Sequence, residues 1–163
     1  LKKLKNKDMK FTVVFCGDGK LKYTIERYCE ENKIDYRITG IIPYDKLPPF
    51  YKLASVLVLP SITTKTFKEP WGLVVNEAFN QGCPVVVTDA VGAGVGGLVK
   101  DGINGFVVPE KDVNSLADAI SKIISNEELR ENLSRNAKEE IKGWTYERQA
   151  EGFLNAIKYV RGV

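Results

Sequence analysis

The chain has 163 residues, of which 44% are hydrophobic and 28% are charged. This length and apolar content suit one domain with a buried core, so we predict that residues 1–163 form a single domain. The 24 Lys and Arg against 21 Asp and Glu leave a formal charge of only +3, which gives no indication of a nucleic-acid binder. The chain has no histidine, so any acid or base chemistry within it falls to carboxylates.

Short apolar runs rich in branched residues alternate with helical patterns along the first two-thirds of the chain. We predict strands at residues 11–15, 36–39, 56–59, 85–88 and 106–108. The helices predicted between them span residues 21–31, 48–54 and 73–81. This alternation predicts an α/β fold, with one Rossmann-like parallel sheet of about five strands and helices on both faces.

The last third of the chain is predicted to be helical. Apolar residues follow helical spacing over residues 113–124 behind Asp112 as a cap, and over residues 129–141 behind Asn126. A final helix begins near Tyr146, and its apolar face is longer than a small sheet needs. We therefore expect the terminal helix, residues 145–163, to share that face with something outside this chain.

The three cysteines and the lack of long apolar runs bear on the cellular location. Cys16, Cys29 and Cys83 lack the close pairing of metal ligands or of a disulfide framework, so we expect reduced core thiols. The sequence has neither the ~18 apolar residues of a membrane span nor a secretory signal. A cytoplasmic location is the expectation.

The loop after the third predicted strand is the richest candidate for chemistry. Ligands of open parallel sheets bind beyond the carboxyl ends of the strands, where this loop lies. It carries Glu69, with Gly72 at the start of the next helix and Glu77 in its second turn. The free amides of Gly72, Leu73 and Val74 at a helix N-terminus suit a pyrophosphate. Glu77 could then accept hydrogen bonds from ribose hydroxyls, although the spacing alone also fits two ordinary surface carboxylates.

The segment EPWGLVVNEAFNQGCPVVVTDAVG resembles the motif of family 4 (group 1) retaining glycosyltransferases of GT-B fold, in which two glutamates flank a glycine-bearing turn. The similarity extends in order through VVFCGDG, ITGIIPYDKLPPFYKLASVLVLPS and LVKDGINGFVVPEKD to the trailing helices. It implies the C-terminal, donor-binding half of such an enzyme, without its first strand and without the N-terminal acceptor domain. The implied reaction transfers a sugar from a nucleotide-diphosphate sugar to an unidentified acceptor with retention of configuration.

The resemblance also implies roles for individual residues. Glu69, as the catalytic glutamate, would touch hydroxyls of the donor sugar, and Glu77 would bind the nucleotide ribose. Lys65 and Lys68 fit solvated loop lysines better than phosphate ligands. The other implied donor-binding residues are Trp71, Gly72, Leu73 and Val74 through their backbone amides, Ile42 at the base, and Ser61 beside the same cleft.

No metal or cofactor is implied, because in this family the leaving diphosphate is thought to assist deprotonation of the acceptor. The implied partners are a nucleotide sugar, an acceptor and the missing N-terminal domain of the same protein, but not nucleic acid. Peripheral membrane association through the missing half stays open. Family members grip the diphosphate with a Gly-Arg and a Lys that this chain lacks, so the isolated fragment is expected to be inactive.

Two other functions stay open from the residues themselves. A catalytically silent nucleotide-binding or interaction domain could keep Glu77 and lack the basic pair. Gly92, Gly94 and Gly97 match the G-x-G-x-x-G pattern of a dinucleotide-binding oxidoreductase module. Asp101 ends the helical pattern too soon for the long helix that this motif opens, so we favour the glycosyltransferase.

The resemblance also has a departure at Gly97, where members of the family commonly have an acidic residue. A contact from that loop is therefore expected to be lost.

Overall fold

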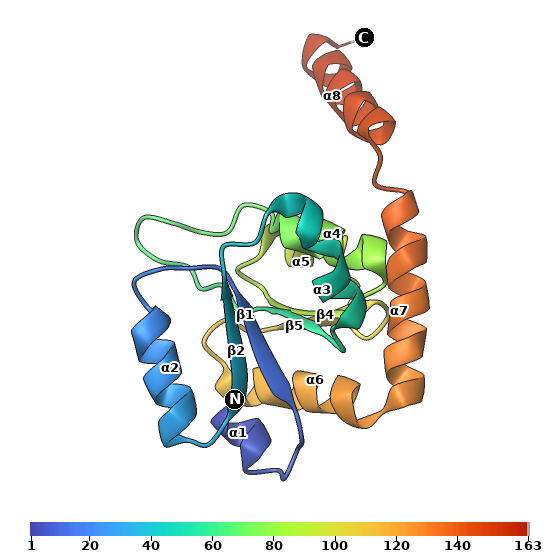
Figure 1. The fold of residues 1–163 in the computed structure, drawn as a ribbon. Coiled ribbons are helices and arrows are strands. Elements are labelled where there is room, and N and C mark those ends of the chain that lie inside the picture. Colours follow the sequence, from blue (N-terminus) through green and yellow to red (C-terminus); the bar gives the residue numbers. More distant parts are fainter. Residues whose placement is uncertain (163) are drawn as a thin grey trace.

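The structure is a computed structural model that describes residues 1–162 (Figure 1). The alternation of strands and helices predicted from the sequence is confirmed, with boundaries that differ by one residue at most for the predicted strands and the helices between them. The elements are α1 (Lys2–Lys5), β1 (Thr12–Cys16), α2 (Lys22–Glu31), β2 (Asp35–Gly40), the 3-10 helix η1 (Tyr44–Lys46), α3 (Pro48–Leu53), β3 (Leu57–Leu59), α4 (Leu73–Gln81), β4 (Val85–Thr88), α5 (Gly92–Val95), β5 (Gly105–Val108), α6 (Val113–Ser125), α7 (Glu127–Lys142) and α8 (Tyr146–Arg161).

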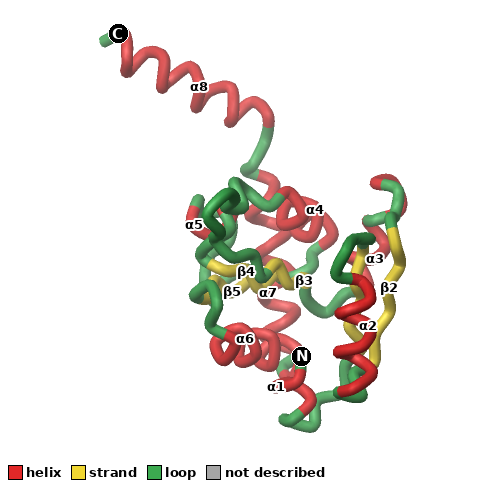
Figure 2. The backbone as a smooth tube through the Cα atoms, turned by 90° about the vertical axis from the view of Figure 1, so that its left-hand side faces the viewer, coloured by secondary structure: helices red, strands yellow, loops and turns green. Residues whose placement is uncertain are grey.

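The predicted α/β fold with parallel pairing of its five strands is confirmed, but the strands form two separate sheets and not the one sheet expected. β1 pairs with β2, while β4 pairs with β3 on one side and β5 on the other. Figure 2 shows β2, with α2, to one side of β3, β4 and β5. An apolar pattern identifies a strand but not its neighbours, and no strand of residues 1–162 lies between β1 and β3 to join the ladders.

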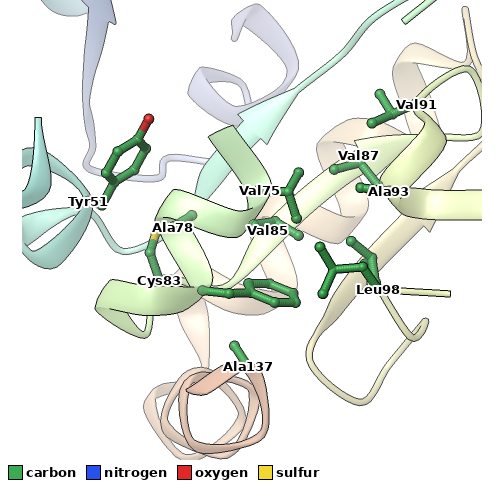
Figure 3. Packing of buried hydrophobic residues seen from close by; sticks show 12 residues of the cluster. Tyr51, Val75, Ala78, Cys83, Val85, Val87, Val91, Ala93, Leu98 and Ala137 are labelled. Atoms are coloured by element: carbon green, nitrogen blue, oxygen red, sulfur yellow. The ribbon is translucent and has the colours of Figure 1, made fainter. Parts of the chain in front are cut away.

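The three-stranded sheet has β4 at its centre, and every residue of β4 is buried. Successive side chains of a strand point to opposite faces, so Val85 and Val87 pack with Phe79 of α4, whereas Val86 packs with Ile123 of α6. Figure 3 shows the first of these clusters, with Ala137 of α7 beneath it. Burial on both faces explains why this strand is a continuous apolar run.

The helical last third of the chain is confirmed, including both predicted caps. The Asp112 carboxylate accepts hydrogen bonds from the amides of Asn114 (2.9 Å) and Ser115 (3.1 Å) at the start of α6. The Asn126 side chain accepts one from the amide of Leu129 (2.9 Å) at the start of α7. These caps satisfy backbone donors that a helix leaves free at its first turn.

The start of the chain packs against α6, and the cysteines differ in part from expectation. Leu4 of α1 is 2% exposed in the cluster that α6 forms, and Lys7 pairs with Asp118 at 2.6 Å. Cys29 and Cys83 are buried, as predicted, and burial raises the pKa of the Cys83 thiol to about 12. Cys16 is exposed, so its assignment to the core was wrong. Its strand β1 has alternating burial, and Cys16 falls on the outer face.

Helix α8 extends away from the body of the molecule (Figures 1 and 2). None of the residues from Tyr146 to Arg161 is buried, so the apolar face that includes Phe153, Leu154 and Ile157 is open to solvent. The expected packing of this face on another domain stays a prediction. Among residues 1–162, no helix combines the length and the apolar character needed to cross a membrane.

Asn104 fixes the turn that leads into β5, and its replacement tests that role. The side chain is 0% exposed, accepts a hydrogen bond from the amide of Lys100 (2.7 Å) and donates one to the carbonyl of Leu98 (3.0 Å). In Asn104→Ala both backbone groups lose their partner, so we expect the free energy of unfolding of the intact protein to fall by about 1–3 kcal/mol in urea denaturation. Asn136→Ala is the control, because Asn136 is exposed and donates to the carbonyl of Ile103. Equal losses in the two variants would contradict this role.

Candidate functional site

The candidate site is built on the loop 60–72, which follows β3 and leads into α4. β3 and β4 are parallel, so this loop and the start of α5 leave the sheet at the same edge. The amide of Gly92 donates to the carbonyl of Glu69 (3.2 Å), and the amide of Ala93 donates to the carbonyl of Trp71 (2.7 Å). The half-buried Glu69 thus sits on a segment whose backbone is held by α5.

The helix N-terminus at Gly72 has the free amides that the sequence predicts. Gly72 has φ 88° and ψ 65°, a left-handed conformation, and a β-carbon there would lie 2.8 Å from Leu59 and 3.0 Å from Val91. Glycine is therefore required by both conformation and space. Within residues 1–162 the amides of residues 71–74 donate to no protein acceptor. Such a row of amides at a helix N-terminus can bind an anion, although diphosphate binding itself stays a prediction.

Glu77 lies on α4 and is hydrogen-bonded to a residue that the sequence analysis missed. The hydroxyl of Tyr51, on α3, donates to the Oε2 atom of Glu77 at 2.6 Å. Tyr51 is buried and Glu77 is half-buried, so this hydrogen bond is partly buried at the margin of the core. The two residues are 26 positions apart and belong to different helices, so no local pattern signals the contact. Only the packing of α3 on α4 brings them together.

Trp71 contributes its side chain to packing as well as its backbone to the loop. The indole Nε1 donates to the Oδ1 atom of Asn76 at 2.8 Å. Its ring packs against Trp144, which follows α7, with centroids 5.2 Å apart and planes at 43°. Trp144 in turn donates from Nε1 to Glu140 (3.2 Å). This aromatic pair connects the loop 60–72, called the glutamate loop below, to the joint between α7 and α8.

The first half of the loop is tied to the ends of β4 and β5. The carbonyl of Ser61 accepts a hydrogen bond from the Thr88 hydroxyl (2.5 Å). The amide of Thr63 donates to the Glu110 carboxylate (2.5 Å), which holds the pKa of Glu110 below its ordinary value. The structure therefore gives Ser61 a part in positioning the loop, and its role as a donor ligand stays a prediction.

The other candidates follow the other sheet or are exposed. Ile42 is half-buried and follows β2, which belongs to the two-stranded sheet. No hydrogen bond of residues 1–162 joins it to the loop 60–72. Lys65 and Lys68 are exposed, as solvated lysines are. Base contact by Ile42 stays a prediction.

The glycine pattern after β4 does not open the long helix of a dinucleotide-binding motif. α5 starts at Gly92 and ends at Val95, and β5 already begins at Gly105. Gly97 has φ 90° and open space around the position of a β-carbon. The dinucleotide interpretation therefore lacks the element on which it depends.

Two cavities of the structure lie away from the candidate site. A cavity of about 470 Å³, lined by residues such as Thr12 and Asp35, lies at the amino ends of β1 and β2. Another of about 280 Å³, lined by residues such as Ser55 and Arg130, lies before β3, and neither cavity contains Glu69 or Glu77. In the described part of the chain no three Cys, Asp or Glu side chains gather to hold a metal ion. That the chemistry uses no metal or cofactor stays a prediction.

Solved structures share this fold. Sucrose-phosphate synthase from Thermosynechococcus elongatus has a TM-score of 0.72 and 28% identity, over 93% of this chain and 38% of its own. The Anabaena protein HepE, solved in complex with UDP, has a TM-score of 0.70 over 89% of this chain and 40% of its own. At 22% identity the second similarity concerns the fold alone. Both support the predicted Rossmann-like fold of a GT-B half-domain.

Sequence comparison identifies the family. An uncharacterised glycosyltransferase of Methanocaldococcus jannaschii is 35% identical over 143 residues, which are 87% of this chain. This chain spans only 39% of the length of that relative. The family model described as "Glycosyl transferases group 1" matches residues 1–140, which is most of the chain. The chain therefore belongs to the group 1 glycosyltransferases, as its glutamate motif predicts.

Proposed function

We propose that this chain is the donor-binding half of a retaining glycosyltransferase that uses a nucleotide-diphosphate sugar. The observation that supports this most directly is the row of free amides at residues 71–74, flanked by Glu69 and Glu77 at one edge of the sheet. Amides at a helix N-terminus suit a diphosphate, and a carboxylate suits paired ribose hydroxyls. The UDP found in the Anabaena relative of the same fold is in keeping with this choice of ligand.

In the proposed reaction the protein positions the reactants and stabilises the leaving group. A hydroxyl oxygen of the acceptor forms a bond to the anomeric carbon of the sugar while the bond from that carbon to the diphosphate breaks. The proton of the acceptor hydroxyl passes to an oxygen of the departing diphosphate. Fixed amides at Gly72, Leu73 and Val74 stabilise the negative charge that develops there, and Glu69 holds hydroxyls of the transferred sugar.

The rest of the active site is proposed to lie outside this chain. This chain spans 39% of the length of its archaeal relative. We therefore assign the acceptor site and further diphosphate-binding residues to the remaining part of the full-length protein. Neither of the two cavities described above contains Glu69 or Glu77, which agrees with a site that another part of the protein completes. We therefore propose that the isolated chain does not turn over substrate.

Ligand-induced stabilisation tests the proposal. We expect UDP, GDP or ADP to raise the melting temperature of the intact protein, since a ligand at 100 times its Kd stabilises the native state by about 2.7 kcal/mol. Glu77→Ala should lose most of this shift, whereas Glu131→Ala, an exposed carboxylate on α7, should keep it. NAD and NADP belong in the same panel. Stabilisation by NAD or NADP alone, or an undiminished shift in Glu77→Ala, would count against the donor site.

A further inference from the structure

The contact between Tyr51 and Glu77 restricts one of the two oxygens of a carboxylate at the candidate site. Oε2 of Glu77 accepts the Tyr51 hydroxyl at 2.6 Å. Within residues 1–162 the other oxygen, Oε1, has no hydrogen-bond partner. A carboxylate accepts hydrogen bonds through both oxygens, so Oε1 stays available to a ligand while Oε2 fixes the side chain.

Tyr51 is suited to this task by its position at the margin of the core. Its ring belongs to the apolar cluster that includes Ala78 and Cys83, while Figure 3 shows its hydroxyl pointing out of that cluster. Burial, and after it the hydrogen bond and negative charge of Glu77, raise the pKa of the Tyr51 phenol far above its ordinary value. The hydroxyl therefore stays protonated at physiological pH and can donate to the carboxylate throughout.

We propose that Tyr51 is a positioning residue, which holds the Glu77 carboxylate in the orientation that recognises the hydroxyls of a nucleotide ribose. This inference rests on the proposed function, because it assumes that Glu77 faces a ribose. Ordering a flexible side chain on binding costs free energy, and a carboxylate already held by Tyr51 avoids that cost. Tyr51 thus acts on the affinity for ribose through Glu77 and touches no reacting atom.

A purely structural role for Tyr51 predicts a different outcome. The ring, and not the hydroxyl, fills the space between α3 and α4, so phenylalanine would serve equally well if packing were the only requirement. If the replacement of Tyr51 disturbed the packing of α3 on α4, it would also lower the affinity for every ligand of the site to the same degree. A role through Glu77 affects only ligands that present ribose hydroxyls.

The test compares nucleoside diphosphates with and without those hydroxyls. Binding of UDP, GDP and ADP, and of their 2′,3′-dideoxy forms, is measured by calorimetry on the intact protein and on Tyr51→Phe. We expect Tyr51→Phe to lower the affinity for the preferred hydroxylated ligand about three- to tenfold, and to leave the affinity for its dideoxy form unchanged. In the Glu77→Ala background, Tyr51→Phe should cause no further loss, because the two residues act as a unit.

Tyr36→Phe is the matched control. It removes another tyrosine hydroxyl that donates to a glutamate, in this case from β2 to Glu30 at 3.2 Å, at a distance from the glutamate loop. It should leave the affinity for both forms of the ligand unchanged. A melting temperature of unliganded Tyr51→Phe close to that of the wild type shows that the fold is kept.

The outcomes separate this inference from the proposed function. If the wild type prefers a hydroxylated ligand and Tyr51→Phe keeps the whole preference, or loses affinity for both forms equally, the positioning role is overturned and the donor site stands. If the wild type binds none of these diphosphates, or binds each diphosphate and its dideoxy form with equal affinity, the proposed ribose contact of Glu77 itself fails.

Discussion

Gly92→Ala is expected to disrupt the glutamate loop and to abolish donor binding. A β-carbon at Gly92 would overlap the backbone of the loop, 2.6 Å from the carbonyl carbon of Pro70 and 2.9 Å from the Cα atom of Trp71. No rotamer change relieves a clash with backbone, so either α5 or the loop must move. We expect the free energy of unfolding to fall by about 3 kcal/mol or more, and the stabilisation by nucleoside diphosphates to disappear.

The measurement is urea denaturation of the intact protein with and without UDP, GDP or ADP. Gly19→Ala is the control, because Gly19 has an ordinary φ and no atom within 4 Å of the position of its β-carbon. This control should stay within about 0.5 kcal/mol of the wild type. A Gly92→Ala variant that keeps both stability and ligand response would show that the loop does not depend on close contact with α5.

Glu69→Gln is expected to remove most of the transferase activity of the full-length enzyme while nucleotide binding persists. The Glu69 backbone is held by Gly92, and within residues 1–162 its carboxylate makes no hydrogen bond, so it is available to the donor sugar. Loss of one preorganised charge at such a position costs on the order of a hundredfold in kcat. The amide keeps the shape of the side chain, so the affinity for the nucleoside diphosphate should change less than about threefold.

The rate of nucleoside diphosphate release from the nucleotide sugar, in the presence of acceptor, measures this effect. Glu131→Gln makes the same chemical change at an exposed site on α7 and should be neutral. An unchanged rate in Glu69→Gln would contradict the catalytic role. A loss of nucleotide affinity as large as that of Glu77→Ala would instead assign Glu69 to nucleotide binding.

Elements with strong local patterns were predicted well from the sequence. β4 is a short apolar run buried on both faces, and α6 and α7 begin at the caps Asp112 and Asn126. α5 was missed because the sequence GAGV has poor helix propensity, and its formation depends on contacts with the glutamate loop. The division into two sheets was missed because strand pairing is a tertiary property that no local pattern encodes.

The site was predictable to the extent that it depends on one short segment. The motif places Gly72 at a helix start with free amides, and the structure confirms both. The left-handed conformation of Gly72 is a finding of the structure. The partners of this segment come from elsewhere in the chain: Tyr51 from α3, Gly92 from α5 and Trp144 from the end of α7. Their contacts follow from helix packing, so the sequence alone did not identify them.

The pairing of Trp71 with Trp144 has a mechanical consequence. Trp144 lies at the base of α8, a helix of 16 residues that spans roughly 24 Å and has no buried residue along its length. A rod held only at its base acts as a lever, and a tilt of about 10° at that base would move its far end by about 4 Å. Trp71 belongs to the loop whose amides are proposed to receive the donor. A movement of that loop that tilted Trp144 would therefore be magnified at the tip of α8, where the chain extends farthest from its own core.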